Sequence, residues 1–193
     1  MKNHFINGKS GRLVSREEKK LKKFCAGSIW YIYSLNQLAM RRLESWLLEY
    51  GESHQNALNK KIHWICVPTI FFSITGLLYA VKLPGQVDGI SLNLAMPVLA
   101  LVVLYYLRLS FPIGVGMLLF GLACCCLAWV LETYLPLPLW VSCLILFVLA
   151  WIGQFYGHSV EGKKPSFLKD IQFLLIGPAW LMHFLLKDWG IRY

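Results

Sequence analysis

The chain has 193 residues, of which 57% are hydrophobic and only 15% are charged. A typical soluble globular protein carries about 25% charged residues, so this composition excludes an ordinary soluble domain. The formal net charge is +9, which favours partners that carry negative charge.

The charged residues are clustered, and five long windows contain none. The windows run over residues 62–81, 89–107, 109–131, 133–160 and 171–186, and they hold 20, 19, 23, 28 and 16 residues. A membrane-spanning helix needs roughly 20 predominantly apolar residues, and a helix satisfies its own backbone hydrogen bonds in lipid. We therefore predict an all-α fold, a polytopic membrane bundle of about five helices, whose last helix either spans fully or re-enters from the same face.

The N-terminal region differs from the rest in being polar and basic, and it does not follow the plan of a cleavable signal peptide. We expect residues 1–27 to form a cytosolic tail that lies against anionic headgroups rather than on nucleic acid, and residues 28–193 to form the membrane-embedded domain. From Ile29 to Tyr50, apolar residues recur at steps of three or four, which predicts an amphipathic helix in the interfacial plane. Gly51 is expected to end this helix.

The membrane helices follow from the apolar windows and the turn residues between them. We expect them at His63–Val81, Ile90–Leu107, Ile113–Leu131, Leu139–Tyr156 and Phe167–Leu186. Pro178 is expected to bend the last helix, because proline removes a backbone hydrogen bond. Glycines 114, 116 and 121 should allow close helix contact.

The distribution of lysine and arginine predicts the orientation. If the five helices alternate, the segments before the first, between the second and third, and between the fourth and fifth share one face. That face collects 16 lysines and arginines and the opposite face 3. Because cytoplasmic loops carry the excess of basic residues, the first face should be cytosolic. It also carries His54, His63, His158 and Glu161, which are remote in sequence.

Three histidines at one membrane face indicate a metal site. Neutral imidazole binds iron, copper, zinc and nickel, and three protein ligands with open positions suit a catalytic metal. His54 and His63 are nine residues apart, so the chain must fold back between them for both to bind one ion. Asn59 and His63 are four apart and share a helical face. A fourth histidine, His183, is a candidate because ionisable groups in membrane segments are usually functional, although a spanning last helix would place it near the opposite face.

A simpler interpretation of these polar residues stays open. His54 could cap the entry turn of the first helix, and His158 could lie among lipid headgroups. The two asparagines, Asn56 and Asn59, could be capping groups, and Glu161 could be a solvated carboxylate beside two lysines.

The two polar clusters together resemble a known family. The run Tyr50-Gly-x-x-His54-x-Asn56-x-x-Asn59-x-x-Ile62-His63-x-x-x-Val67-Pro68, followed by Gln154-Phe-x-Gly157-His158, Glu161 and Pro165, is similar to small membrane proteins related to the fungal 2-hydroxy fatty acid dioxygenase. The resemblance covers about Leu43 to Leu186. The chain departs from the family pattern in carrying Ala57 where a proline is usual, Cys66 where a glycine is usual, and His183 near a usually acidic position.

The resemblance implies an Fe²⁺-dependent enzyme of fatty acid α-oxidation in the endoplasmic reticulum or a bacterial inner membrane. A long-chain 2-hydroxy fatty acid and O2 would yield a fatty acid one carbon shorter and CO2. The expected metal ligands are His54, His63 and His158, with His183 as a possible fourth; Glu161 and Asn59 would serve catalysis by orienting the histidines, and Asn56, Lys163 and Lys164 would bind the substrate.

Two other functions remain as alternatives. The first is a non-catalytic lipid-binding protein or membrane scaffold whose polar loops only anchor headgroups. The second is a di-iron desaturase or hydroxylase, but such enzymes carry many histidines in close boxes, and this chain has five histidines in all.

Overall fold

The computed structural model describes residues 43–52, 54–87, 90–162 and 173–191. The chain divides into two compact units, Met1–Ala39 and Met40–Tyr193, and the described residues all belong to the second. The predicted tail 1–27 and the first part of the predicted interfacial helix lie outside the described residues. The all-α fold class is confirmed, since six of the eight described elements are helices and the other two are the short strands of one hairpin.

The first described element is a helix over residues 43–52 with one buried face. Leu43, Leu47 and Tyr50 are buried, whereas the residues between them are mostly exposed. This is the spacing of an amphipathic helix. The helix continues through Gly51 to residue 52, so the expectation that Gly51 ends it was wrong; glycine permits a helix to end but does not force it.

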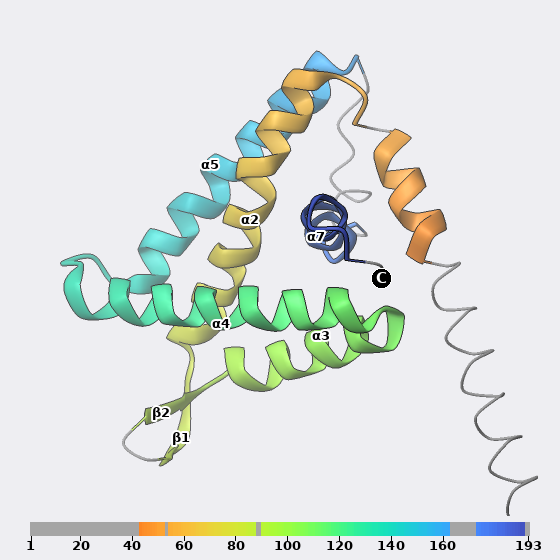
Figure 1. Ribbon diagram of the computed structural model, residues 1–193. Helices are drawn as coiled ribbons and strands as arrows, with labels where there is room; N and C mark the ends of the chain where they lie inside the picture. Colours follow the sequence, from red (N-terminus) through yellow and green to blue (C-terminus); the bar gives the residue numbers. More distant parts are fainter. Residues whose placement is uncertain (1–42, 53, 88–89, 163–172, 192–193) are drawn as a thin grey trace, which may run out of the picture. The chain divides into compact units, whose positions relative to one another are not determined.

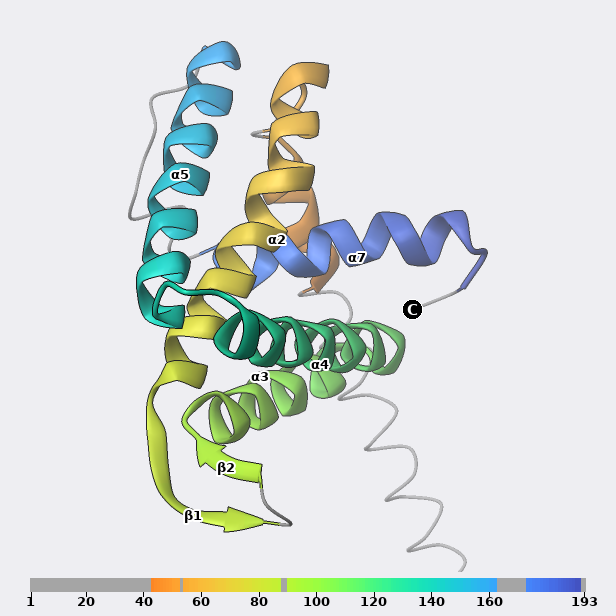
Figure 2. The ribbon, with the colours of Figure 1, turned by 90° about the vertical axis from the view of Figure 1, so that its left-hand side faces the viewer.

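Helices α2 (Ala57–Ala80) and α5 (Leu139–Val160) form the antiparallel pair on which the rest is built, and they lie side by side in both ribbon views (Figures 1 and 2). α2 begins six residues before the predicted start, because Asn56 caps it: the Asn56 side chain accepts a hydrogen bond from the backbone N–H of Leu58 at 2.8 Å. α5 runs four residues beyond its predicted end. The start of α2 and the end of α5 therefore meet as helices rather than as loops.

Small residues let α2 and α5 approach closely along their length. A Cβ atom placed on Gly153 would lie 2.6 Å from the Sγ atom of Cys66, and one on Gly76 would overlap Cys143. Packing of this kind is common between apolar helices that have only van der Waals contact to hold them. Cys66, one of the three departures from the family pattern, thus fills the space that Gly153 leaves.

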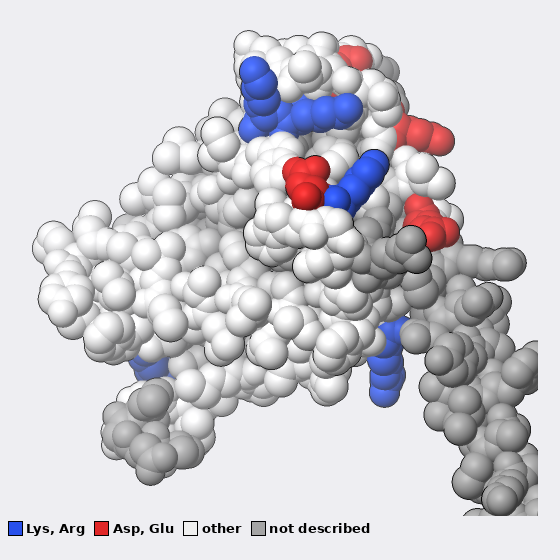
Figure 3. Space-filling view, in the orientation of Figure 1, with Lys and Arg blue, Asp and Glu red and all other residues white. Residues whose placement is uncertain are grey.

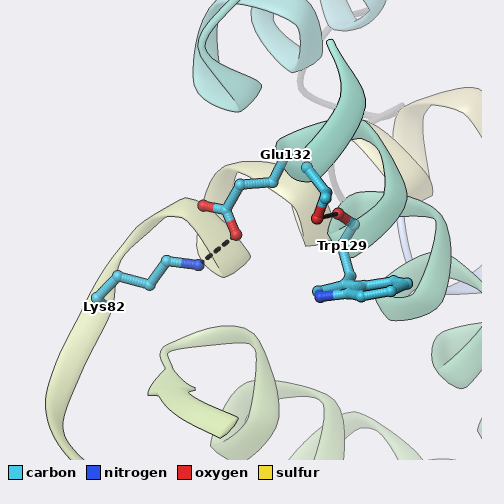
Figure 4. A network of polar contacts seen from close by, with 4 residues as sticks. Lys82, Trp129 and Glu132 are labelled. Atoms are coloured by element: carbon cyan, nitrogen blue, oxygen red, sulfur yellow. Dashed lines mark hydrogen bonds and ion pairs between the residues drawn. The ribbon is translucent and has the colours of Figure 1, made fainter.

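A β-hairpin follows α2 where the sequence predicted a turn and the start of a helix. Strand β1 (Lys82–Val87) pairs antiparallel with β2 (Ile90–Asn93), and α3 (Ala95–Leu109) begins only after it. The expected helix start at Ile90 was therefore wrong: residues 90–93 use their backbone groups to pair with β1 and cannot also begin a helix. Lys82 joins the hairpin to the end of α4 (Phe111–Tyr134) through an ion pair with Glu132 at 2.7 Å (Figure 4).

α3 reverses tightly into α4 (Phe111–Tyr134), and Ser110 is the boundary residue of both helices. Pro112 stands in the first turn of α4, where proline is favoured. The glycines of α4 allow close contact, as predicted: Gly114 and Gly121 face Leu107 and Leu99 of α3, and Gly116 faces Met182 of the last helix.

The last helix, α7 (Ile176–Asp188), is shorter than predicted. Its described start comes just before Pro178, which occupies the first turn, where a missing N–H costs no helical hydrogen bond. The expected bend at Pro178 was therefore wrong. Residues 163–172, where we expected this helix to begin, lie outside the described residues. Just before α7, the Leu175 carbonyl accepts a hydrogen bond from the Tyr106 hydroxyl of α3.

Within the described part of the chain, three helices are long and apolar enough to cross a membrane: α2, α4 and α5. α3 has 15 residues and α7 has 13, so neither reaches the roughly 20 that a span needs. The window 89–107 was expected to span, and the window 171–186 was expected either to span or to re-enter from the same face. The lengths of α3 and α7 do not fit full spans, so the assumed alternation of five spans does not hold for these helices. Uncharged side chains cover most of the face over α4 and α5, whereas charged ones gather nearer α7 and the start of α2 (Figure 3). The exposed apolar residues on α4 and α5 include Leu119, Leu122, Leu149 and Ile152.

Candidate metal centre and adjoining pocket

Three buried histidines come together where α2 begins and α5 ends. One ligand atom from each of His54, His63 and His158 lies within 4.8 Å of the other two, and the exposed fractions of the side chains are 2%, 1% and 6%. The ring centroids are 4.3 Å apart for His54 and His63, 4.9 Å for His63 and His158, and 5.4 Å for His54 and His158. The structure thus brings together the three histidines that sequence reasoning selected from two distant segments.

His54 lies in the short link between the first helix and α2, and an aromatic setting holds its ring. The ring stacks on Tyr50 at 4.2 Å between centroids with 20° between planes, and Trp180 of α7 lies 5.5 Å away. The Nδ1 atom of His54 is 2.6 Å from the backbone carbonyl of Tyr50. A carbonyl can only accept, so in the neutral ring Nδ1 carries the proton and Nε2 keeps the lone pair that binds a metal.

His63 is oriented in the same way from within α2. Its Nδ1 atom lies 3.0 Å from the backbone carbonyl of Asn59, one turn earlier. This contact again places the proton on Nδ1 and leaves Nε2 as the ligand atom. Two of the three rings are therefore set in the tautomer that leaves Nε2 able to bind a metal.

The position of His158 depends on the glycine before it. A Cβ atom on Gly157 would fall well inside van der Waals contact of the Asn59 side-chain oxygen. Only glycine lets α5 approach α2 closely enough here for His158 to reach His63. The close approach of the two helices is therefore the physical reason for a glycine at this position of the motif.

Glu161, the residue that ends α5, holds the start of α2. Its carboxylate accepts hydrogen bonds from the backbone N–H groups of Gln55 at 2.8 Å and Asn56 at 2.9 Å, and from the Asn59 side chain at 3.0 Å. A carboxylate is favoured at this position because the N-terminus of a helix carries unpaired N–H groups and partial positive charge. Glu161 is therefore not a solvated loop carboxylate. It joins the segments that carry all three histidines.

The hydrogen bonds also set the ionisation of Glu161. Burial by itself raises the pKa of this carboxyl, but the hydrogen bonds from Asn56, Asn59 and Gln55, and the nearby His54, outweigh burial and lower the pKa below its ordinary value of 4.5. Glu161 is thus ionised at neutral pH, and this suits a group that accepts several hydrogen bonds.

Comparison with known proteins agrees with this site. A family model described as 2-hydroxy-palmitic acid dioxygenase Mpo1-like matches residues 40–189. The chain belongs to this family. It is 35% identical over 150 residues to the 2-hydroxy-palmitic acid dioxygenase MPO1 of Saccharomyces cerevisiae, an alignment that covers 75% of this chain and 80% of the yeast protein. No solved structure matches the chain.

The donor set of this Mpo1-like chain fits a metal ion. Imidazole nitrogens bound to one ion at about 2.0–2.1 Å lie at most about 4.2 Å apart, so a group within 4.8 Å needs to contract only slightly. Three imidazoles also leave coordination positions open, as a catalytic metal requires. The fixed tautomers of His54 and His63 leave the Nε2 atoms of both rings able to bind a cation.

An open pocket of about 650 Å³ adjoins the histidines, and His54 belongs to its wall. The pocket lies between the first described helix, the start of α2 and α7. Its lining residues are Glu44, Leu47, Leu48, Gly51, Glu52, His54, Gln55, Lys60, Trp180, His183 and Phe184.

The other predicted site residues are placed as follows. His183 lies on α7 and lines the pocket, outside the group of three histidines; because α7 is too short to span, His183 is not carried to the opposite face as a spanning helix would require. Burial and the nearby Lys187 lower the pKa of His183.

Asn56 caps α2 and does not line the pocket. Lys163 and Lys164 lie outside the described residues.

Sequence reasoning missed Tyr50, Trp180 and Lys60 as parts of the site. Tyr50 stands at the head of the quoted motif, so its position was available as a signal. Trp180 lies far along the chain in an apolar window and could be placed beside His54 only by the tertiary structure. Lys60 was counted as a cytosolic charge but not assigned to the site.

Proposed function

We propose that this chain is an Fe²⁺-dependent dioxygenase of fatty acid α-oxidation. It would convert a long-chain 2-hydroxy fatty acid and O2 into a fatty acid one carbon shorter, CO2 and water. The observation that carries the proposal is the meeting of three buried histidines from two distant segments within 4.8 Å. The name of the yeast relative supplies the substrate class.

The bond changes of this reaction balance with O2 as the oxidant. The bond between C1 and C2 of the hydroxy acid breaks, C1 leaves as CO2, and C2 is oxidised from an alcohol to a carboxyl carbon. Bound Fe²⁺ would supply the redox chemistry that activates O2 next to the substrate.

The residues of the chain would hold and orient this site. His54, His63 and His158 would bind the ion through Nε2, with the first two rings fixed by the carbonyls of Tyr50 and Asn59. Groups that orient metal-bound histidines in this way typically change metal affinity or activity about 10- to 100-fold when they are removed. Burial of the three rings also excludes bulk water from the reacting centre.

The proposal includes a location in a membrane. The three long apolar helices α2, α4 and α5 support residence in the endoplasmic reticulum or a bacterial inner membrane. The 12 lysines and arginines that precede His63 in the sequence support a site that faces the cytosol.

The test uses the full chain purified in detergent. We expect about one iron per chain, and O2 consumption with 2-hydroxypalmitate in step with release of CO2 from C1. Palmitate, which lacks the hydroxyl group, is the matched control substrate and should not be consumed. His158→Ala and chelator treatment should both abolish turnover. Full activity in either case would overturn the proposal and leave the lipid-binding scaffold as the better interpretation.

A further inference from the structure

The pocket beside His54 has a volume and a shape suited to a small ligand. Its volume of about 650 Å³ falls within the range of about 300–1,000 Å³ typical of small-molecule sites. Two helix faces form its walls. The residues contributed by the first helix recur at steps of three or four from position 44 to 52, and those of α7 are Trp180, His183 and Phe184.

The apolar part of the lining comes from both walls. Leu47 is buried, whereas Leu48 is 71% exposed, so the apolar lining continues from the interior to the surface. On α7, Trp180 and Phe184 are one turn apart, and their rings meet edge to face at 4.7 Å. An alkyl chain could lie against these side chains and reach the surface at Leu48.

The charged part of the lining allows one orientation for an acid. Lys60 stands near the start of α2, three residues before His63, so both lie on the same side of that helix. The two carboxylates in the pocket, Glu44 and Glu52, belong to the first helix and not to α2, and they would repel a third carboxylate. Lys60 is partly buried, whereas its neighbour Lys61 is exposed and does not line the pocket.

We propose that this pocket binds the hydroxy fatty acid, with the substrate carboxylate paired to Lys60 and the alkyl chain packed against Trp180 and Phe184. The inference rests on the proposed function for the identity of the ligand. Lys60 and His54 line the same pocket, so a carboxylate paired with Lys60 would hold C2, the carbon that is oxidised, in the pocket that His54 adjoins. The role proposed for Lys60 is of the same kind as the role that the sequence suggested for Lys163 and Lys164, which lie outside the described residues.

The test measures binding separately from turnover. Iron-loaded full-length protein in lipid nanodiscs is kept free of O2, and 2-hydroxypalmitate displaces a fluorescent fatty acid from it. We expect Lys60→Gln to weaken binding about tenfold or more, because a charge-assisted hydrogen bond is lost. Lys61→Gln is the matched control and should bind within about twofold of the unmodified chain, and Lys60→Arg should restore most of the affinity.

A second pair of variants tests the apolar wall. Phe184→Ala should weaken binding of 2-hydroxypalmitate more than that of a short 2-hydroxy acid, because the lost contact is to the alkyl chain. Leu185→Ala, at a neighbouring position of α7 that does not line the pocket, should have no such effect. Equal binding by the Lys60 and Lys61 variants, or by the Phe184 and Leu185 variants, would overturn the assignment of the pocket.

The two proposals fail in distinguishable ways. Binding that depends on Lys60 without any O2 consumption on readmission of air would remove the dioxygenase and keep the pocket. Turnover with an unchanged KM in Lys60→Gln would keep the dioxygenase and remove the pocket.

Discussion

The two ends of the α2–α5 pair differ in the burial of their polar side chains. Where α2 begins and α5 ends, three histidines and Asn59 are buried, and Glu161 accepts hydrogen bonds from backbone and side-chain donors of the α2 start. At the other end, Lys82 and Glu132 form one ion pair with side chains that are 40% and 37% exposed (Figure 4). Burying polar groups is costly unless they are well paired. The histidine end therefore indicates a function, whereas the ion pair needs only a structural explanation.

The largest difference between the two ends should appear in metal content. We expect alanine substitution of His54, His63 or His158 to reduce bound iron to a small fraction of one per chain, since two imidazoles rarely hold a metal by themselves. His183→Ala serves as the control and should retain iron, because His183 lies outside the group of three. Elemental analysis after gel filtration checks this. Loss of iron in the His183 variant alone would show that the centre has been assigned to the wrong residues.

Close packing at the histidine end should be sensitive to a single methyl group. Gly157→Ala should lower the free energy of unfolding by about 1–3 kcal/mol, because the added Cβ overlaps the Asn59 side chain. Gly121→Ala is the matched control on α4: there the nearest atom would lie 3.4 Å away, and alanine is the better helix former. Thermal unfolding in one detergent compares the two variants, and equal stability would contradict a close approach at Gly157.

The carboxylate at the histidine end should also matter more than the one at the far end. Glu161→Gln is expected to weaken iron affinity about 10-fold or more, because the α2 start loses a charged acceptor of several hydrogen bonds. Glu132→Gln should leave iron affinity unchanged. Competition with a chelator of known affinity measures both, and equal affinity in the two variants would count against an orienting role for Glu161.

The contribution of Glu161 to stability should depend on pH with a defined sign. The folded chain lowers the pKa of Glu161 below 4.5, so the unfolded chain binds this proton more tightly than the folded chain. The stabilisation is therefore complete above about pH 4.5 and is lost as the pH falls through the lower folded value. The difference in melting temperature between the unmodified chain and Glu161→Gln should shrink on acidification. A difference that grows below pH 4.5 would reverse the sign and contradict the assigned contacts.

The smallest effect is expected at the exposed ion pair. Lys82→Ala should change the free energy of unfolding by at most about 1 kcal/mol, because exposed pairs are screened by solvent. Its ammonium group also lies 4.3 Å from the Tyr79 ring centroid, a contact that Lys82→Arg should keep. Denaturation at low and high salt separates the two contributions. If Lys82→Ala lowered the free energy of unfolding as much as Gly157→Ala does, the two ends would not differ in their contribution to stability.

Local sequence was enough to predict the three long helices and the three histidines of the site. Charge-free windows of 20, 23 and 28 residues correspond to α2, α4 and α5, because a long apolar run in a chain with few charges favours a helix in lipid. The motif spacing selected His54, His63 and His158, since residue types that bind metals stood at both polar clusters. The windows of 19 and 16 residues correspond to helices too short to span.

Tertiary structure decided the contacts that join distant positions. Residues 82–87 pair with residues 90–93 as strands where a helix start was expected. The hydrogen bonds from the start of α2 to the Glu161 carboxylate join residues more than 100 positions apart. Trp180 beside His54 and Lys60 in the pocket wall depend on where α7 packs. Periodicity and composition report only on neighbours within a few turns, whereas these contacts depend on how whole helices pack, which no short stretch of sequence contains.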